Sequence, residues 1–401
     1  MGLKSLKRAP SRVDIGRLVS IANHAQEILK ELFDDLAESS PRKFAPTFSS
    51  STVAKLCHIE RARLNYLCSR GRTERYPIGS LPGGSRGRTF TLAEARAFVR
   101  ANGRYRPRPE GQKGVICTIS NFKANVGKAT CVVALAQGLT LQGHKVLLID
   151  LDPQARATTL MGYVPEAEIG EQMTVLPVIY GQQKDLRYAP RPTYWDGLDL
   201  IPSCHALFAA NRHLADNKAD NVSFDFGKVL DTALEPLRSQ YDVILIDTAP
   251  TLSYLTVAAY IATDGLIVPV SVETLGFVSS VQFFQQLVNL FEHLSNNCTI
   301  EKNFEFIKIV MSAVNSSSAT TAVVREWIKH TYHEWVVTGT IVETDTIKSA
   351  STESQTLYEI GQNDGFCRIR ERRRVNRVNC GARTQDESIC STSKGCVFLS
   401  T

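Results

Sequence analysis

A short segment between an apolar stretch and a helical stretch constrains the fold of this chain more than any other feature. Residues 115–119 are apolar enough for a buried strand, and residues 131–142 have the composition of a helix. Between them lies Lys123-Ala124-Asn125-Val126-Gly127-Lys128-Ala129-Thr130. A strand, a loop with lysines and a helix in this order predict a phosphate-binding loop, in which backbone N–H groups and the helix N-terminus hold a polyphosphate.

Three positions of this segment depart from a standard phosphate-binding loop. Glycines usually follow the first lysine, where the backbone turns and approaches oxygen closely, but here the residues are Ala124 and Asn125. The position after the second lysine usually carries a hydroxyl for Mg²⁺, and here it is Ala129. Thr130 has a hydroxyl, but one residue along a helix it points about 100° away. We therefore expect Mg-ATP binding and turnover to be strongly reduced or abolished.

Apolar strands and helical stretches alternate throughout the region that follows. The expected strands are residues 115–119, 145–150, 198–201, 242–247, 265–270 and 306–311. Continuous apolar strands separated by helices predict an α/β fold with a doubly wound, mostly parallel sheet that helices cover on both faces. Ligands of such sheets bind beyond the carboxyl ends of the strands.

Three aspartates follow these expected strands. Asp150 and Asp152 come at the end of the second strand, and Asp247 ends the fourth. A single aspartate at such a position usually caps the next helix. Three of them beside a loop with lysines favour a Mg²⁺ site instead, because Mg²⁺ prefers a few carboxylates together with waters and phosphate oxygens.

Together these motifs resemble the ParA family of plasmid and chromosome partition ATPases, in its subgroup with an N-terminal helix-turn-helix. The resemblance covers residues 13–362. The family loop, Lys-Gly-Gly-x-Gly-Lys-Thr-Thr, is matched at four of its seven fixed positions. The family motif Asp-x-Asp-Pro-Gln is intact at residues 150–154, and Tyr-Asp-x-x-x-x-Asp-x-x-Pro is intact at residues 241–250. Residues 354–359 also resemble the sequences of this family.

The resemblance implies roles for the site residues, with ATP and Mg²⁺ as cofactors. Lys123 would reach across an ATP-bound dimer to the partner's phosphates, and Asp152 would orient or activate the attacking water, so these two would be catalytic. Asp150 and Asp247 would support Mg²⁺, while Lys128 would bind the β- and γ-phosphates. The whole set expected at the nucleotide is Lys123, Asn125, Val126, Gly127, Lys128, Ala129 and Thr130.

The resemblance also implies a function. ParA proteins are ATP-dependent, DNA-associated homodimers that segregate a plasmid or chromosome with a ParB-type partner, and the subgroup with the extra domain represses its own operon. The altered loop leaves open whether this chain is an active ATPase or a DNA-binding repressor with a vestigial nucleotide site. Another enzyme of the same superfamily, such as a metal-cluster or cell-division-site protein, is a third option that the N-terminal unit disfavours.

Residues 1–44 are expected to form an amphipathic helix that Pro41 ends. An alternating four-three spacing on one face comprises Leu18, Ala22, Ala25, Leu29, Leu32 and Leu36. This pattern favours a two-chain seam over a helix packed on its own chain.

Residues 45–103 are expected to be a helix-turn-helix unit, with helices at 52–57 and 61–68 joined by a turn at His58 and Ile59. Residues 71–88 resemble a wing. Thr91 and Glu94 form a capping box at the start of another helix. The alternative is a helical hairpin without DNA contact, which the many arginines in this unit disfavour.

The remaining divisions are a proline-containing linker at 104–113, the nucleotide-binding domain at 114–362 and an atypical tail at 363–401. The tail contains many arginines and four cysteines without zinc-site spacing. It is either a basic DNA-binding tail or, as the composition favours, the product of a shifted reading frame.

The longest apolar runs are too short to cross a membrane, and no secretory signal is evident. We expect a cytoplasmic, nucleoid-associated protein.

Overall fold

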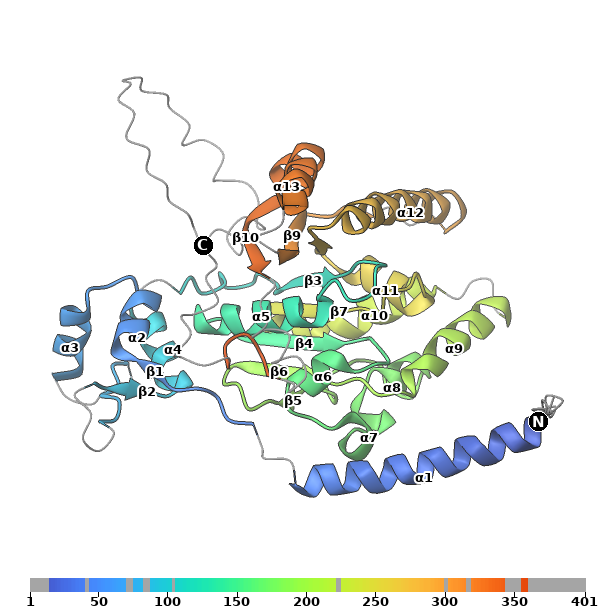
Figure 1. The fold of residues 1–401 in the computed structure, drawn as a ribbon, viewed down its shortest axis with the longest axis horizontal. Helices are drawn as coiled ribbons and strands as arrows, with labels where there is room; N and C mark the ends of the chain where they lie inside the picture. The colour runs from blue at the N-terminus through green and yellow to red at the C-terminus, as the bar shows by residue number, and fades with distance from the viewer. Residues whose placement is uncertain are drawn as a thin grey trace, which may run out of the picture.

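The computed structural model describes residues 14–39, 43–69, 75–81, 87–102, 105–220, 225–298, 302–314, 319–342 and 355–359. An eight-stranded sheet with helices on both faces forms its centre, and a small helical unit and one long helix lie beside it (Figure 1). The tail at 363–401 and much of the expected wing lie outside the described residues.

The central sheet has the strand order β10-β9-β8-β3-β7-β4-β6-β5. All neighbouring pairs are parallel except β5 with β6, which confirms the predicted doubly wound, mostly parallel sheet. Its strands are β3 (Val115–Ile119), β4 (Val146–Asp150), β5 (Arg191–Pro192), β6 (Leu198–Ile201), β7 (Val243–Asp247), β8 (Gly265–Ser271), β9 (Phe306–Val314) and β10 (Val336–Val342).

Six of these strands were expected, and two edge strands were not. β5 is only two residues long and contains Pro192, which removes a backbone donor. β10 carries Gly339 and two threonines in its centre, so it lacks the continuous apolar run of the other strands. Both lie at the ends of the sheet, where a strand needs less apolar surface.

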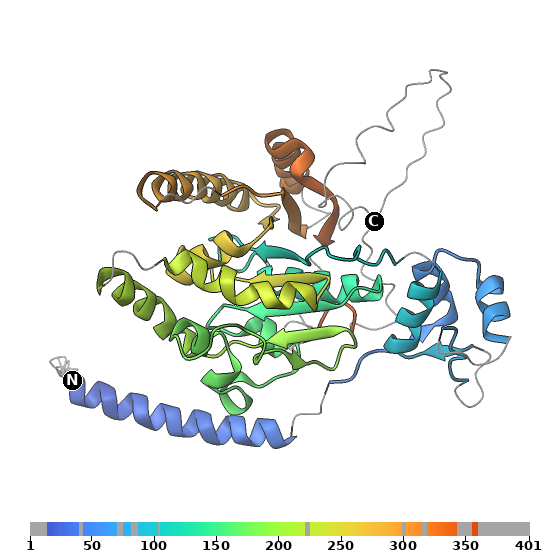
Figure 2. The same ribbon diagram turned by 180° about the vertical axis from the view of Figure 1, so that it is seen from behind.

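Helices of the same region pack on both sheet faces, as Figures 1 and 2 show from opposite sides. They are α5 (Lys128–Leu141), α6 (Arg156–Leu160), α7 (Pro165–Glu168), α8 (Leu176–Ile179), α9 (Leu207–Asp220), α10 (Phe226–Leu234), α11 (Tyr254–Ala262), α12 (Thr274–Cys298) and α13 (Ala319–Tyr332). Short 3-10 turns lie at Glu171–Met173, Glu235–Ser239 and His333–Trp335.

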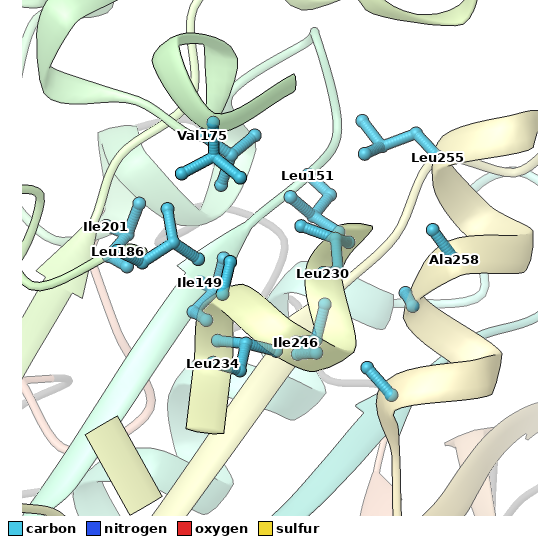
Figure 3. Close-up of a cluster of buried hydrophobic side chains, with 14 of the residues drawn as sticks. Ile149, Leu151, Val175, Leu186, Ile201, Leu230, Leu234, Ile246, Leu255 and Ala258 are labelled. Atoms are coloured by element: carbon cyan, nitrogen blue, oxygen red, sulfur yellow. The ribbon is translucent and has the colours of Figure 1, made fainter. Parts of the chain in front are cut away.

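Side chains of each central strand alternate between two cores. In β7, Ile244 and Ile246 belong to the core under α10 and α11, whereas Val243 and Leu245 belong to the core under α5. Figure 3 shows the first core, where Ile246 lies near Leu234 of α10. Full burial of one such aliphatic side chain stabilises the fold by about 1.5–3 kcal/mol, which holds β7 rigidly in the middle of the sheet.

The small unit contains α2 (Ser50–Leu56), α3 (Arg61–Ser69) and α4 (Leu92–Ala101), with β1 (Phe48–Ser49) paired to β2 (Thr89–Phe90). His58 forms the turn between α2 and α3 with a positive φ of 52°. Ala54 of α2 and Leu64 of α3 are both buried, in agreement with their expected packing. The capping box of Thr91 and Glu94 is confirmed at the start of α4. Contact with DNA stays a prediction.

Arg96 anchors this unit to the sheet domain. Its side chain is buried and donates to the backbone oxygens of Thr140 at 2.9 Å and His144 at 3.0 Å, and it pairs with Asp196. Thr140 lies in the last turn of α5, where a cation interacts favourably with the unsatisfied carbonyls. The end of α5 therefore contacts the small helical unit.

The long helix α1 (Ile15–Ser39) lies alongside α7 (Figure 1). Leu18, Leu29 and Leu32 of the expected apolar face are each about half exposed in the single chain. Pairing of this face with a second chain stays a prediction.

Candidate functional site

The lysine-bearing loop lies at the carboxyl end of β3, a central strand, and leads directly into α5. Asn125 and Gly127 both have left-handed backbones, with φ of 59° and 80°. Asparagine tolerates this conformation better than most residues, so Asn125 can stand where the standard loop has glycine. A Cβ at Gly127 would meet no atom within 4 Å, so there is open space beside this residue. No side chain caps α5, which leaves its first N–H groups directed at this opening.

The loop is fixed from behind by two contacts. Val126 is buried against the sheet, and its backbone oxygen accepts a hydrogen bond of 2.8 Å from Ser312 Oγ of β9. These contacts hold the loop against the sheet.

Lys128 is nearly buried at the first position of α5. Its Nζ lies 3.3 Å from the backbone oxygen of Lys123. Burial lowers the pKa of Lys128, while the nearby carboxylates of Asp247 and Asp152 oppose this shift and the charge of Arg156 adds to it. A polyphosphate in the loop would favour the charged form of Lys128.

Lys123 is held within its own chain at the end of β8. Its Nζ lies 3.1 Å from Ser271 Oγ and 3.3 Å from Glu273 Oε2. An ion pair this exposed contributes at most about 1 kcal/mol. Breaking the contact with Glu273 so that Lys123 can bind phosphate oxygens would therefore cost little free energy.

Asp150 and Asp247 lie side by side as register partners at the ends of β4 and β7, and both are buried. Asp150 accepts hydrogen bonds from Thr158 N at 2.9 Å, Thr158 Oγ1 at 2.8 Å and Asp152 N at 3.0 Å. Burial raises the pKa of Asp150 to about 7. Asp247 accepts from Thr248 N at 3.1 Å, and burial followed by the charge of Asp150 raises its pKa well above the usual value.

Asp152 lies one step beyond the sheet edge and is only half-buried. Its Oδ1 accepts from Gln154 N at 3.0 Å, and its backbone oxygen accepts from Ser203 Oγ at 2.6 Å. The carboxylate is thus held in place but still reaches solvent. The structure brings Asp152 to the same sheet edge as Asp247 and Lys128, as the sequence predicted.

The sequence matches the family described as AAA domain over residues 114–306. SopA of Escherichia coli K12 is 34% identical over 251 residues, which cover 60% of this chain and 62% of SopA. The matched part is thus less than two thirds of that relative. Soj of Bacillus subtilis, a sporulation initiation inhibitor protein, is 31% identical over 188 residues, which cover 47% of this chain and 70% of Soj. The chain belongs to the ParA family of partition ATPases.

A solved structure, named Partition Protein, has the same fold as this ParA-family chain. Its TM-score is 0.61 at 19% identity, and the superposition covers 85% of this chain and 96% of that one. At this identity the likeness concerns the fold.

No helix among the described residues is both long enough and apolar enough to cross a membrane.

The loop of this ParA-family chain fits a polyphosphate better than it fits Mg²⁺. The open space beside Gly127, the uncapped start of α5 and Lys128 are all suited to phosphate oxygens. Ala129 offers no oxygen and packs its methyl group against the core under α5. Both carboxylate oxygens of Asp150 already accept hydrogen bonds, one from Thr158 and the other from Asp152 N, as in a helix-capping residue. Within the described ranges, no three His, Cys, Asp or Glu side chains converge on one point.

Sequence reasoning missed several residues of the site. Ser271, the last residue of β8, and Glu273 just after it contact Lys123, and Ser312 of β9 contacts the loop. No local motif marks them, because they reach the site only through strand order. Arg156 could have been noticed, since it comes two residues after the intact Asp-x-Asp-Pro-Gln motif.

Proposed function

We propose that this protein is a ParA-type partition protein that binds a nucleoside triphosphate, dimerises and associates with DNA. In this proposal it segregates a plasmid or chromosome together with a ParB-type centromere-binding partner. The observation that carries the proposal is the loop at Gly127, with Lys128 next to the loop backbone and near the carboxylates of Asp247, at the end of β7, and Asp152, just after β4. Similarity to SopA and Soj supports the same function.

The small helical unit is proposed to bind DNA and to repress the protein's own operon. Lys55 of α2 and Arg61 and Arg63 of α3 are exposed, so their charges are available to phosphates. Because Arg96 joins this unit to the end of α5, its position is tied to the helix that begins at the nucleotide loop.

A second candidate function is a DNA-binding repressor whose nucleotide site is vestigial. Ala129 favours it, because the family hydroxyl for Mg²⁺ is missing. In this alternative the sheet domain serves as a scaffold, and DNA binding does not respond to nucleotide.

Nucleotide-dependent dimerisation separates the two functions. We would measure the mass of the full chain by sedimentation with no nucleotide, with ADP and with ATP, and measure DNA binding under the same conditions. A partition protein shifts to a dimer with ATP and gains affinity for nonspecific DNA, whereas Lys128→Ala does not. Operator binding that is unchanged by any nucleotide would establish the repressor instead.

A further inference from the structure

We propose that Arg156 is a third phosphate-binding cation of this site, and that it allows the site to hold a nucleoside polyphosphate without Mg²⁺. The inference rests on the proposed nucleotide-binding function and specifies its ligand as the metal-free polyphosphate. It links two departures from the family loop, Asn125 and Ala129, that otherwise have no common reason.

Arg156 is brought to the loop by a sharp turn after β4. Ala155 has a left-handed backbone with φ of 51°, and Arg156 follows as the first residue of α6. Arg156 Nη1 donates to Asn125 Oδ1 of the loop at 3.4 Å. A glycine at position 125 would offer no side-chain oxygen to this guanidinium, so the substitution that departs from the family motif is also the one that positions Arg156.

Arg156 forms no ion pair within the described part of the chain. No carboxylate there lies within ion-pair distance of it, and its side chain is exposed. Lys123, by contrast, is paired with Glu273, and Lys128 is nearly buried against the loop. The effect of Arg156 on the pKa of Lys128 indicates that the two cations share one electrostatic environment. Lys128 has the carboxylates of Asp247 and Asp152 nearby, so Arg156 is the cation of this pair whose charge is more available to an added anion.

A guanidinium can neutralise phosphate charge, which is one of the roles of Mg²⁺ in such sites. Mg²⁺ normally neutralises the β- and γ-phosphate charges, and it needs the hydroxyl that Ala129 lacks. Arginine binds phosphate oxygens in a bidentate manner and carries its charge permanently, so it neutralises a polyphosphate without a coordination shell. A site with Arg156, Lys128 and the loop N–H groups therefore suits ATP or ADP as the free anion.

Isothermal titration of the full chain with ATP tests the inference, once in Mg²⁺ and once in EDTA. We expect the wild-type Kd to differ by less than about threefold between the two buffers, and Arg156→Gln to weaken binding about tenfold or more in both. Arg156→Lys, which keeps the charge, should recover part of the loss. Arg212→Gln, which removes an exposed arginine of α9 far along the chain, is the matched control and should bind as the wild type does.

The remaining outcomes distinguish this inference from the proposed function. Binding that requires Mg²⁺, or that is unchanged in Arg156→Gln, would overturn the inference and leave the nucleotide switch intact. Absence of ATP binding in both buffers, with circular dichroism showing a folded chain, would overturn both. A further check is Ala129→Thr, which should make the affinity higher in Mg²⁺ than in EDTA because it restores the metal's hydroxyl.

Discussion

Asp150 and Asp247 are paired in register at the last residues of two adjacent parallel strands, β4 and β7. Both are buried, and the pKa of each is raised, first by burial and, for Asp247, also by the charge of its neighbour. Lys128 is the cation that opposes this effect at Asp247. The site therefore contains a buried acidic pair, and the charge of the loop lysine partly offsets the effect of burial at Asp247.

Restoring the family loop should raise ATP hydrolysis. The combined changes Ala124→Gly, Asn125→Gly and Ala129→Thr return the backbone freedom and the Mg²⁺ hydroxyl that the loop lacks. We expect kcat to rise about tenfold or more, which requires only about 1.4 kcal/mol of added transition-state stabilisation. Phosphate release is measured with DNA and the ParB-type partner present. The same variant with Lys128→Ala should fall back to background, and family-level turnover by the unaltered chain would contradict the prediction.

Loss of Arg96 should destabilise the protein. Arg96→Met keeps most of the side-chain volume but leaves the backbone oxygens of Thr140 and His144 without this buried donor. We expect a loss of about 2–4 kcal/mol, because unsatisfied buried polar groups are costly. Urea unfolding followed by circular dichroism measures it. Arg61→Met, on the exposed surface of α3, should change stability by less than about 0.5 kcal/mol.

Asp242 should contribute stability that depends on pH. Burial alone would raise the pKa of Asp242, but the nearby His144, with Nδ1 3.8 Å from Asp242 Oδ2, and a hydrogen bond from Lys145 N at 2.8 Å outweigh it and lower the pKa below its usual 3.8. A depressed pKa stabilises the fold above the unfolded value, and this contribution disappears as the pH falls through the folded value. Asp242→Asn should therefore cost about 1 kcal/mol at neutral pH, with the difference shrinking below about pH 4.

The measurement for Asp242 is urea unfolding of wild type and variant between neutral and acidic pH. Asp216→Asn, at an exposed position of α9, is the control and should leave the curve unchanged. A difference between wild type and Asp242→Asn that is constant across this range would show that the carboxylate charge has no part in stability.

The exposed arginines of α3 should contribute to DNA binding. Replacing Arg61 and Arg63 together by alanine removes two cations from the expected recognition helix. If both contact phosphates, the slope of log K against log salt should fall by up to about 2. Fluorescence anisotropy with labelled operator and random DNA measures this. Arg212→Ala should leave both slopes unchanged, and an unaltered slope in the double variant would favour a hairpin without DNA contact.

The strands that carry the site were predictable because they are fully buried. β3, β4 and β7 are continuous apolar runs that end at polar residues, so the expected ranges agree with the structure to within one residue. β10 could not be recognised, since an edge strand with Gly339 has little apolar pattern. The positive φ of Asn125 was foreseeable from residue type, because asparagine is one of the few side chains that tolerate it.

The sequence by itself determined the ParA family, the parallel sheet and the list of cations and aspartates in the loop motifs, since these follow from local pattern and residue chemistry. Only the tertiary structure decided which of those groups meet. Strand order placed Asp150 beside Asp247, and brought Ser271, Glu273 and Ser312 to the loop from strands far along the chain. The turn at Ala155 directed Arg156 to Asn125. Contacts of this kind depend on crossovers and backbone turns, which no short sequence window encodes.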